Sequence, residues 1–177
     1  MAYSSGFSPH PRVSYVNPAP TGAESEAEYL VIGLRESCDP SVVRTRLDAA
    51  MPEGFPILDV TEAGDQSFEA SLWEAHLSDV EQTALSYAVE TFLASPEAIV
   101  SRETKNGLRT FDAKPAVESL SVAGPATLAM VIRHTEPLVR PDDVVSALRS
   151  LDPDLPDQPP LMKRVRQGPT ADLLLAV

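Results

Sequence analysis

The sequence predicts an α+β protein made of tandem ferredoxin-like units, the first of which lacks its opening strand and helix. Residues 67–177 read strand, helix, strand, inserted segment near 103–124, strand, helix, strand. Without the insertion, this is the six-element ferredoxin-like order. Residues 1–66 read strand, strand, helix, strand, which are the last four elements of the same order. A single larger α+β sheet is the alternative.

Three short strands are expected in the first unit. Arg12–Val16 reads as the first strand and is followed by a Pro/Gly turn region through Gly22. Tyr29–Leu34 is apolar almost throughout, which is typical of a strand covered on both faces. Phe55–Val60 completes the set as the third strand.

The helix of the first unit is expected to start at Asp39-Pro40. The Asp39 carboxylate can cap the first turn, and the missing N–H of Pro40 is harmless at the first helical position. An apolar helical face follows before a proline and a glycine end the run: Val43, Leu47 and Ala50, then Pro52 and Gly54.

The second unit opens with a strand over Leu72–Leu77. Ser78-Asp79-Val80-Glu81 then has the spacing of a capping box, which predicts a helix. The apolar face of that helix consists of Leu85, Val89 and Phe92. Ala98–Arg102 is expected to return as a strand.

The inserted segment contains the turn signal Asn106-Gly107, and Asp112 can cap a short helix over Ala113–Leu120. Beyond it, Leu128–Ile132 is a strong strand and Leu161–Val165 forms the last one. The helix between them opens at Pro141 and buries Val144, Val145 and Leu148. The basic run Lys163-Arg164-Val165-Arg166 is typical of a solvated edge strand that guards against aggregation.

Three blocks of sequence resemble one known family. They are Gly6-Phe7-Ser8-Pro9-His10-Pro11-Arg12 with the segments that follow it, Lys105-Asn106-Gly107-Leu108-Arg109-Thr110-Phe111-Asp112, and Arg133-His134-Thr135 with Arg140-Pro141-Asp142-Asp143-Val144. In the same order over nearly the whole chain, these blocks resemble the radical SAM-linked protein family, a bacterial domain of unknown function. Members are encoded beside, or fused to, a radical SAM protein, and some lie near ribonuclease E/G genes. The resemblance therefore implies a radical SAM partner and RNA-related chemistry. It also implies that a strand and a helix are missing before the Pro-His-Pro block.

Composition limits the class of protein. At 177 residues and 43% hydrophobic, the chain can bury a core, and its single cysteine, Cys38, excludes an internal disulfide and a three-cysteine iron–sulfur site. We therefore expect a separate polypeptide to supply any radical SAM chemistry. No stretch reaches the roughly 18 apolar residues of a membrane span, so a cytoplasmic protein is expected. The formal charge of −12 argues against a broad nucleic-acid surface and leaves only local RNA contacts.

Two short segments are candidate anion-binding sites. Pro9-His10-Pro11-Arg12 is stiff, so it can present His10 and Arg12 to an anion or base, or serve only as a rigid connector. Lys105, Asn106 and Arg109 combine two cations with an exposed turn, which fits a small anion site or a solvated hairpin tip.

The third candidate lies after the strand Leu128–Ile132. Arg133, His134 and Arg140 can gather near a helix N-terminus and bind an anion there. The alternative for His134 is a core histidine, because alternation places it with Met130 and Ile132 and its ring can bond to a carbonyl.

No residue set identifies a reaction. Histidines at 10, 76 and 134 with one cysteine lack the spacing of a metal site, and no glycine-rich loop indicates a nucleotide cofactor. We expect an accessory module that binds RNA or another anionic substrate for a separate radical SAM enzyme and is not catalytic alone. The alternatives are an independent RNA-modifying enzyme with His10, Asp112 or His134 as acid/base groups, and a protein-interaction module.

Overall fold

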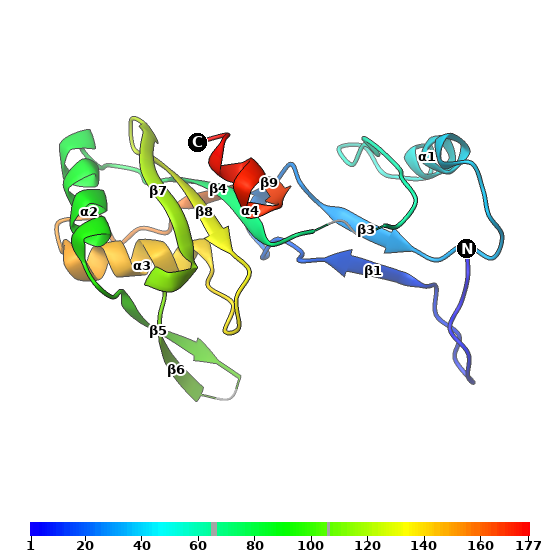
Figure 1. The fold of residues 1–177 in the computed structure, drawn as a ribbon, viewed down its shortest axis with the longest axis horizontal. Helices are drawn as coiled ribbons and strands as arrows, with labels where there is room; N and C mark the ends of the chain where they lie inside the picture. The colour runs from blue at the N-terminus through cyan, green and yellow to red at the C-terminus, as the bar shows by residue number, and fades with distance from the viewer. Residues whose placement is uncertain (65–66, 106) are drawn as a thin grey trace. The chain divides into compact units, whose positions relative to one another are not determined.

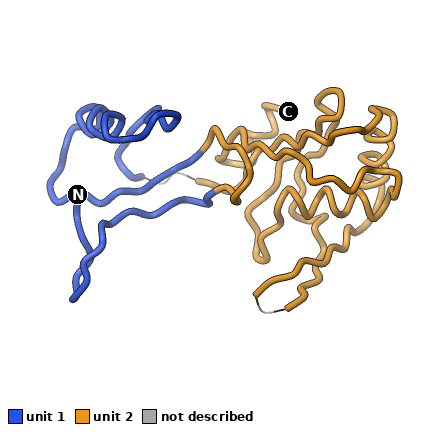
Figure 2. The backbone as a smooth tube through the Cα atoms, turned by 180° about the vertical axis from the view of Figure 1, so that it is seen from behind, with its two compact units in different colours: residues 1–18, 28–66 blue, residues 19–27, 67–177 orange. Residues whose placement is uncertain are grey.

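The computed structural model describes residues 1–64, 67–105 and 107–177 as a mixed α+β protein of two compact units. Unit 1 comprises residues 1–18 and 28–66, and unit 2 comprises residues 19–27 and 67–177 (Figure 2). Within the described residues there are three sheets, one of five strands and two of two strands. The α+β class is thus confirmed, whereas the tandem ferredoxin-like arrangement stays a prediction.

A five-stranded sheet organises unit 2 (Figure 1). Its strand order is β2-β9-β4-β8-β7, where β4 pairs antiparallel with both β9 and β8, and β8 pairs antiparallel with β7. The short β2 pairs parallel with β9 and comes from the segment that links the two parts of unit 1. The bounds are β2 Glu24–Ser25, β4 Ala70–His76, β7 Val117–Gly124, β8 Thr127–Arg133 and β9 Leu161–Gly168.

Apolar side chains alternate between the two faces of this sheet. One face packs on α2 (Gln82–Ala94) and α3 (Pro141–Leu151) and forms the main core, in which Met130, Phe92 and Leu148 are fully buried. The other face carries a small cluster with the short helix α4 (Thr170–Leu174). The prediction of an apolar face on each long helix is confirmed, because Leu85, Val89, Phe92, Val144, Val145 and Leu148 are all buried.

The start of α2 differs from its prediction. The helix begins at Gln82, and Glu81 makes no capping bond through its side chain. Asp79 has a positive φ of 58°, which is incompatible with a helical turn through the predicted box. At the other end of the helix, the Lys114 ammonium donates to the Leu93 carbonyl at 3.0 Å and lies 4.5 Å from the Phe92 ring centroid. A cation there compensates the carbonyls that a helix C-terminus leaves unpaired.

The second strand of the main sheet was predicted wrongly. The segment expected to supply it forms β5 (Ile99–Thr104), which pairs only with β6 (Gly107–Asp112) in a separate hairpin. The sheet strand is β7, where a helix over 113–120 was expected. Asp112 Oδ1 accepts from Lys114 N at 2.9 Å, but the residue at the cap position is Ala113, and the turn that follows is only a 3₁₀ helix over Lys114–Ala116. The turn Asn106-Gly107 lies partly outside the described residues.

Unit 1 contains a two-stranded ribbon and one helix. β1 (Val13–Val16) pairs antiparallel with β3 (Tyr29–Ile32). The predicted cap of α1 (Pro40–Asp48) is confirmed, because Asp39 Oδ1 accepts from Ser41 N at 2.8 Å. The prediction that β3 is covered on both faces is wrong, since Leu30 and Val31 remain about 40% and 43% exposed. None of the described residues of unit 1 is buried.

The third strand expected in unit 1 does not form among the described residues. Residues 55–60 run in irregular backbone that is bound to α1 through side chains. Ile57 N donates to Asp48 Oδ1 at 2.8 Å, and Arg44 Nε donates to Ile57 O at 3.1 Å. These side-chain contacts take the place of strand pairing. The proline at position 56 has no N–H to donate to a strand ladder.

The two units should therefore differ in local stability. We expect amide hydrogens of β4, β8 and β9 to exchange with solvent only through global unfolding, whereas those of β1 and β3 exchange rapidly. Hydrogen-exchange mass spectrometry checks this with peptides from each strand of the intact chain. Equal protection of β1 and β4 would contradict this account of burial.

Candidate functional site

Two arginines face each other across the hairpin β5–β6. Arg102 and Arg109 are directly paired in register, so their side chains lie on the same face of the hairpin. Like charges in such a position repel each other. The hairpin extends from unit 2 beside α3, as Figure 1 shows.

The Arg102 guanidinium is held by three groups. Its Nη1 lies 2.6 Å from Asp143 Oδ2, its Nη2 donates to the Leu138 carbonyl at 3.2 Å, and its Cζ lies 5.3 Å from the Phe111 ring centroid. The Arg102 side chain is 21% exposed and that of Asp143 only 6%. This contact joins β5 to the first turn of α3. Sequence reasoning missed both residues, since 41 positions separate them.

Asp143 also belongs to the capping box of α3, in which Arg140 occupies the cap position. Its Oδ2 accepts from Arg140 N at 2.7 Å at the start of the helix. Burial raises the pKa of the Asp143 carboxyl, whereas the bond from Arg140 N and the charges of Arg102 and Arg140 act in the opposite direction. One carboxylate thus fixes both the helix start and the hairpin.

The other hairpin cations face solvent. Arg109 is 48% exposed along its side chain and lies 4.0 Å from the carboxylate of Glu136, which is 93% exposed. Lys105 is exposed at the hairpin turn, and Arg140 is exposed at the cap position of α3. Asn106 lies outside the described residues. We name the exposed cations Lys105, Arg109 and Arg140 the hairpin patch.

Arg133, His134 and Arg140 do not gather around one point. The Arg133 guanidinium pairs with Glu118 at 3.1 Å and donates to the Pro115 carbonyl at 2.7 Å, close to β7. His134 bonds to groups near the start of β4. Arg140 belongs to the hairpin patch.

His134 is half-buried beside the sheet. Its Nδ1 donates to the Phe68 carbonyl at 2.7 Å, so Nε2 of the neutral ring accepts from the Ser71 hydroxyl at 2.8 Å. Burial lowers the pKa of the His134 imidazole, the Arg164 charge lowers it further, and the bond to Phe68 opposes both. The ring is therefore neutral at pH 7.

Arg164 corrects the prediction of a solvated basic edge strand. Its side chain is fully buried, with Cζ 5.4 Å from the Trp73 ring centroid and Nε donating to Ser25 Oγ at 3.3 Å. The strand is not an edge, because β2 covers its outer side. Alternation from the apolar Met162 would have placed Arg164 on the core face.

Gln167 continues this buried polar row on β9. Its Nε2 donates to the Ala27 carbonyl at 2.6 Å, while its buried Oε1 has no hydrogen-bond partner among the described residues. The row ties residues 19–27 to the sheet.

The N-terminal candidates belong to unit 1. His10 is exposed in a loop closed by the bridge Tyr3–Pro11, and its backbone bonds to Ser4 in both directions. Arg12 is exposed, while its backbone N and O bond to Ala2 and Gly33. Both side chains are therefore exposed to solvent, while the backbone that carries them is held by hydrogen bonds.

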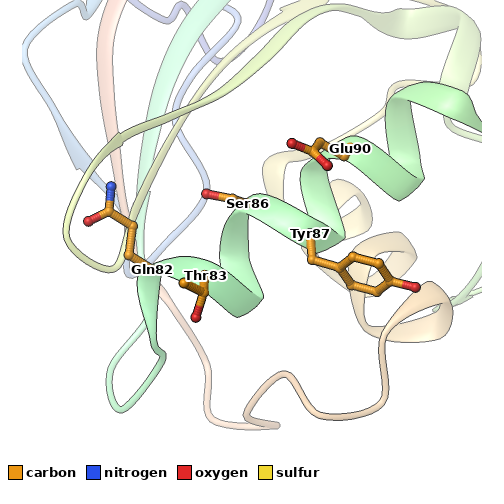
Figure 3. A pocket seen from close by; sticks show the side chains of 5 residues that line it. All are labelled: Gln82, Thr83, Ser86, Tyr87 and Glu90. Atoms are coloured by element: carbon orange, nitrogen blue, oxygen red, sulfur yellow. The ribbon is translucent and has the colours of Figure 1, made fainter.

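A shallow groove along α2 is separate from all these residues. One face of the helix supplies its entire lining, as Figure 3 shows: Gln82, Thr83, Ser86, Tyr87 and Glu90. Across the described part of the chain, no group of three metal-ligating side chains is found. The same residues include no helix with the length and apolar character of a membrane span.

Comparison with known proteins yields one match. A family model described as "Uncharacterized protein conserved in bacteria (DUF2344)" matches residues 1–141, which include unit 1, the hairpin and all three cations of the patch. No curated protein and no solved structure matches the chain.

Replacing His134 by Ala should lower the free energy of unfolding by roughly 1 to 3 kcal/mol, because packing is lost and Ser71 and Phe68 lose their partner. The matched control is His76→Ala, which removes an exposed ring with one 3.3 Å contact and should change stability by less than about 0.5 kcal/mol. Urea titrations measure both. Equal effects would contradict a structural role of His134.

The same histidine should make stability depend on pH. A folded pKa below the ordinary 6.5 means that the unfolded chain binds the proton more tightly, so stability is full above about pH 6.5 and falls as the pH drops toward the folded pKa. Urea titrations between pH 7.5 and pH 5, run on the wild type and His134→Ala, isolate this contribution. Their stability difference should shrink with acidification, and a difference that grows would reverse the sign of the effect.

Proposed function

We propose that this chain, which belongs to the DUF2344 family of uncharacterized proteins conserved in bacteria, is an accessory module that binds RNA or another anionic substrate for a separate radical SAM enzyme and does not catalyse alone. The observation that carries this proposal is the hairpin patch. Its cations are exposed, and two of them, Arg109 and Arg140, are connected through the backbone to the partly buried ion pair of Arg102 with Asp143.

Charge balance within the hairpin favours an anionic ligand. Arg102 is neutralised by the buried carboxylate of Asp143, whereas the one ion pair of its cross-strand neighbour Arg109 among the described residues is a 4.0 Å contact with an exposed carboxylate. Exposed pairs of this kind contribute little free energy. A phosphate or carboxylate at Arg109 would gain a charge-assisted bond and relieve the repulsion between the two guanidinium groups.

A local site also fits the chain's overall charge. With a formal charge of −12, a polyanion is repelled by most of the surface, so binding must depend on a few cations acting at short range. RNA is the anion that the sequence resemblance favours. A location in the bacterial cytoplasm, where RNA is accessible, follows from the same proposal.

The radical SAM partner is implied by the sequence resemblance alone. A single exposed cysteine cannot hold a three-cysteine iron–sulfur cluster, so a second polypeptide would bring the radical chemistry.

We also infer a ferredoxin-like fold for unit 2. Its support is the element order β4, α2, β7, β8, α3, β9 and the antiparallel strand order β9-β4-β8-β7.

A second candidate is an RNA-modifying enzyme that acts independently. The neutral His134 ring, oriented by Phe68 and bonded to the Ser71 hydroxyl, has the arrangement of a general base with its nucleophile. Ser71 is only 1% exposed, however, so substrate cannot reach its hydroxyl in this conformation. Turnover of RNA without a partner would favour this candidate over the accessory module.

Replacing Lys105 and Arg109 together by Ala should weaken binding of single-stranded RNA and flatten its salt dependence. The slope of log K against log salt concentration is negative, and each lost phosphate contact reduces its magnitude by about 0.7. Loss of both contacts should therefore reduce the magnitude by about 1.4. Fluorescence anisotropy at several salt concentrations measures the slope. Stability should change by less than about 0.5 kcal/mol, because both side chains are exposed.

Arg166→Ala is the matched control, since this exposed arginine lies on β9 in the same unit. It should leave both affinity and slope close to the wild-type values. Because the control removes one positive charge and the double variant removes two, a loss of binding free energy in the control about half that of the double variant would mean that RNA responds only to net charge. Wild-type protein that binds neither RNA nor a radical SAM partner would refute the accessory role, and binding of the protein partner alone would favour an interaction module.

A further inference from the structure

We propose that Arg102 is a positioning residue for the hairpin patch, where it sets the cations for neighbouring phosphates of one RNA strand without touching the RNA itself. This inference rests on the proposed function and deepens it. It assigns different roles to two arginines that the hairpin register places side by side.

The contacts of Arg102 point inward. Its guanidinium bonds to Asp143 and to the Leu138 carbonyl, and it stacks on Phe111 of the opposite strand. These partners come from β6, from the segment before α3 and from the first turn of α3. Arg102 thus connects both strands of the hairpin to the helix start.

Two exposed cations are connected through the backbone to the ion pair of Arg102 with Asp143. Arg109 is the cross-strand partner of Arg102, and Arg140 donates its backbone N–H to the carboxylate that Arg102 binds. Their backbones are therefore held through a single ion pair. Loss of that ion pair would let the hairpin move against α3 and would separate the two cations, so a ligand that contacts both would have to order them again.

A guanidinium suits this role better than an ammonium. Its planar group can meet a carboxylate and a carbonyl in fixed directions while its face lies on an aromatic ring. A lysine at this position keeps the charge but offers a compact head that cannot satisfy all three partners together. Arg102→Lys therefore separates position from charge.

The salt dependence of binding distinguishes a positioning residue from a ligand contact. Arg102 is already neutralised by Asp143, so it releases no counterion when RNA binds, whereas Arg109 does. A positioning residue changes affinity at constant slope. A contacting residue changes both.

The test measures binding of a fluorescent single-stranded RNA oligonucleotide of mixed sequence across a salt series. Arg102→Lys, which keeps the charge balance with Asp143, should weaken binding by roughly tenfold with an unchanged slope, because the hairpin cations must be ordered on binding. Arg109→Met should weaken binding and reduce the magnitude of the slope of log K against log salt concentration by about 0.7. Arg166→Ala again serves as the control.

Hydrogen exchange of the hairpin, measured without RNA, provides a second readout. Amides of β5 and β6 should exchange faster in Arg102→Lys and Asp143→Asn than in the wild type, and at the wild-type rate in Arg109→Met. Circular dichroism checks that each variant folds. If Asp143→Asn does not fold, Arg102→Lys alone still tests the proposal.

Each contrary result has a distinct meaning. A salt dependence of binding that is weaker in Arg102→Lys than in the wild type would make Arg102 an RNA contact and overturn its positioning role. Unchanged affinity or unchanged hairpin exchange in that variant would overturn it too. Absence of wild-type binding to RNA would instead exclude RNA as the ligand of the hairpin patch, and with it any role of Arg102 toward RNA, while the exchange data would still decide whether Arg102 anchors the hairpin.

Discussion

The ion pair between the buried Asp143 carboxylate and the partly buried Arg102 guanidinium is the contact on which the meeting of the hairpin β5–β6 with α3 depends. Removing a charge of this kind from water is costly, and the attraction of the pair offsets that cost only when further bonds satisfy the remaining groups. Here the Leu138 carbonyl and the Arg140 N–H supply them. Breaking one side would leave the other charge buried and unpaired, so hairpin and helix start are expected to stay together.

Burial and exposure divide the charged residues of the protein into two kinds. Asp143 and Arg164 are buried, Arg102 is partly buried, and all three connect segments that are distant in sequence. The hairpin patch is exposed and has little effect on stability, so it can respond to a ligand. In the main sheet, Arg164 and Gln167 fix residues 19–27 beside β9, as Arg102 fixes the hairpin beside α3. Unit 1 lacks any such enclosed group among its described residues.

Local signals predicted the elements whose reasons are local. Asp39 capping α1, the apolar strand at 128–132 and the buried faces of α2 and α3 follow from residues close in sequence. The helix expected over 113–120 was wrong because the bond from Lys114 N to Asp112 precedes only one 3₁₀ turn. Pairing of β7 with β8 then determined the rest, and such pairing depends on tertiary contacts that a capping signal does not include.

The candidate site was only partly predictable for the same reason. Lys105 and Arg109 could be named because a turn with cations is a local pattern. The anchor beside them could not, since Arg102 and Asp143 are brought together only when the hairpin meets α3. Arg164 was misread because its cover, β2, comes from 139 positions earlier in the chain. Grouping Arg133 with His134 and Arg140 treated neighbours in sequence as neighbours in space.

The central claim is that an anionic ligand binds at one place, the hairpin patch, on an otherwise acidic protein. Amide chemical shifts of the ¹⁵N-labelled chain, followed while single-stranded RNA is added, test this most directly. The account predicts that the largest changes fall on residues 102–112 and 136–143, while β9 and α4 keep their shifts. Changes spread evenly over the surface, or concentrated at the His10 loop with the hairpin unaffected, would contradict it.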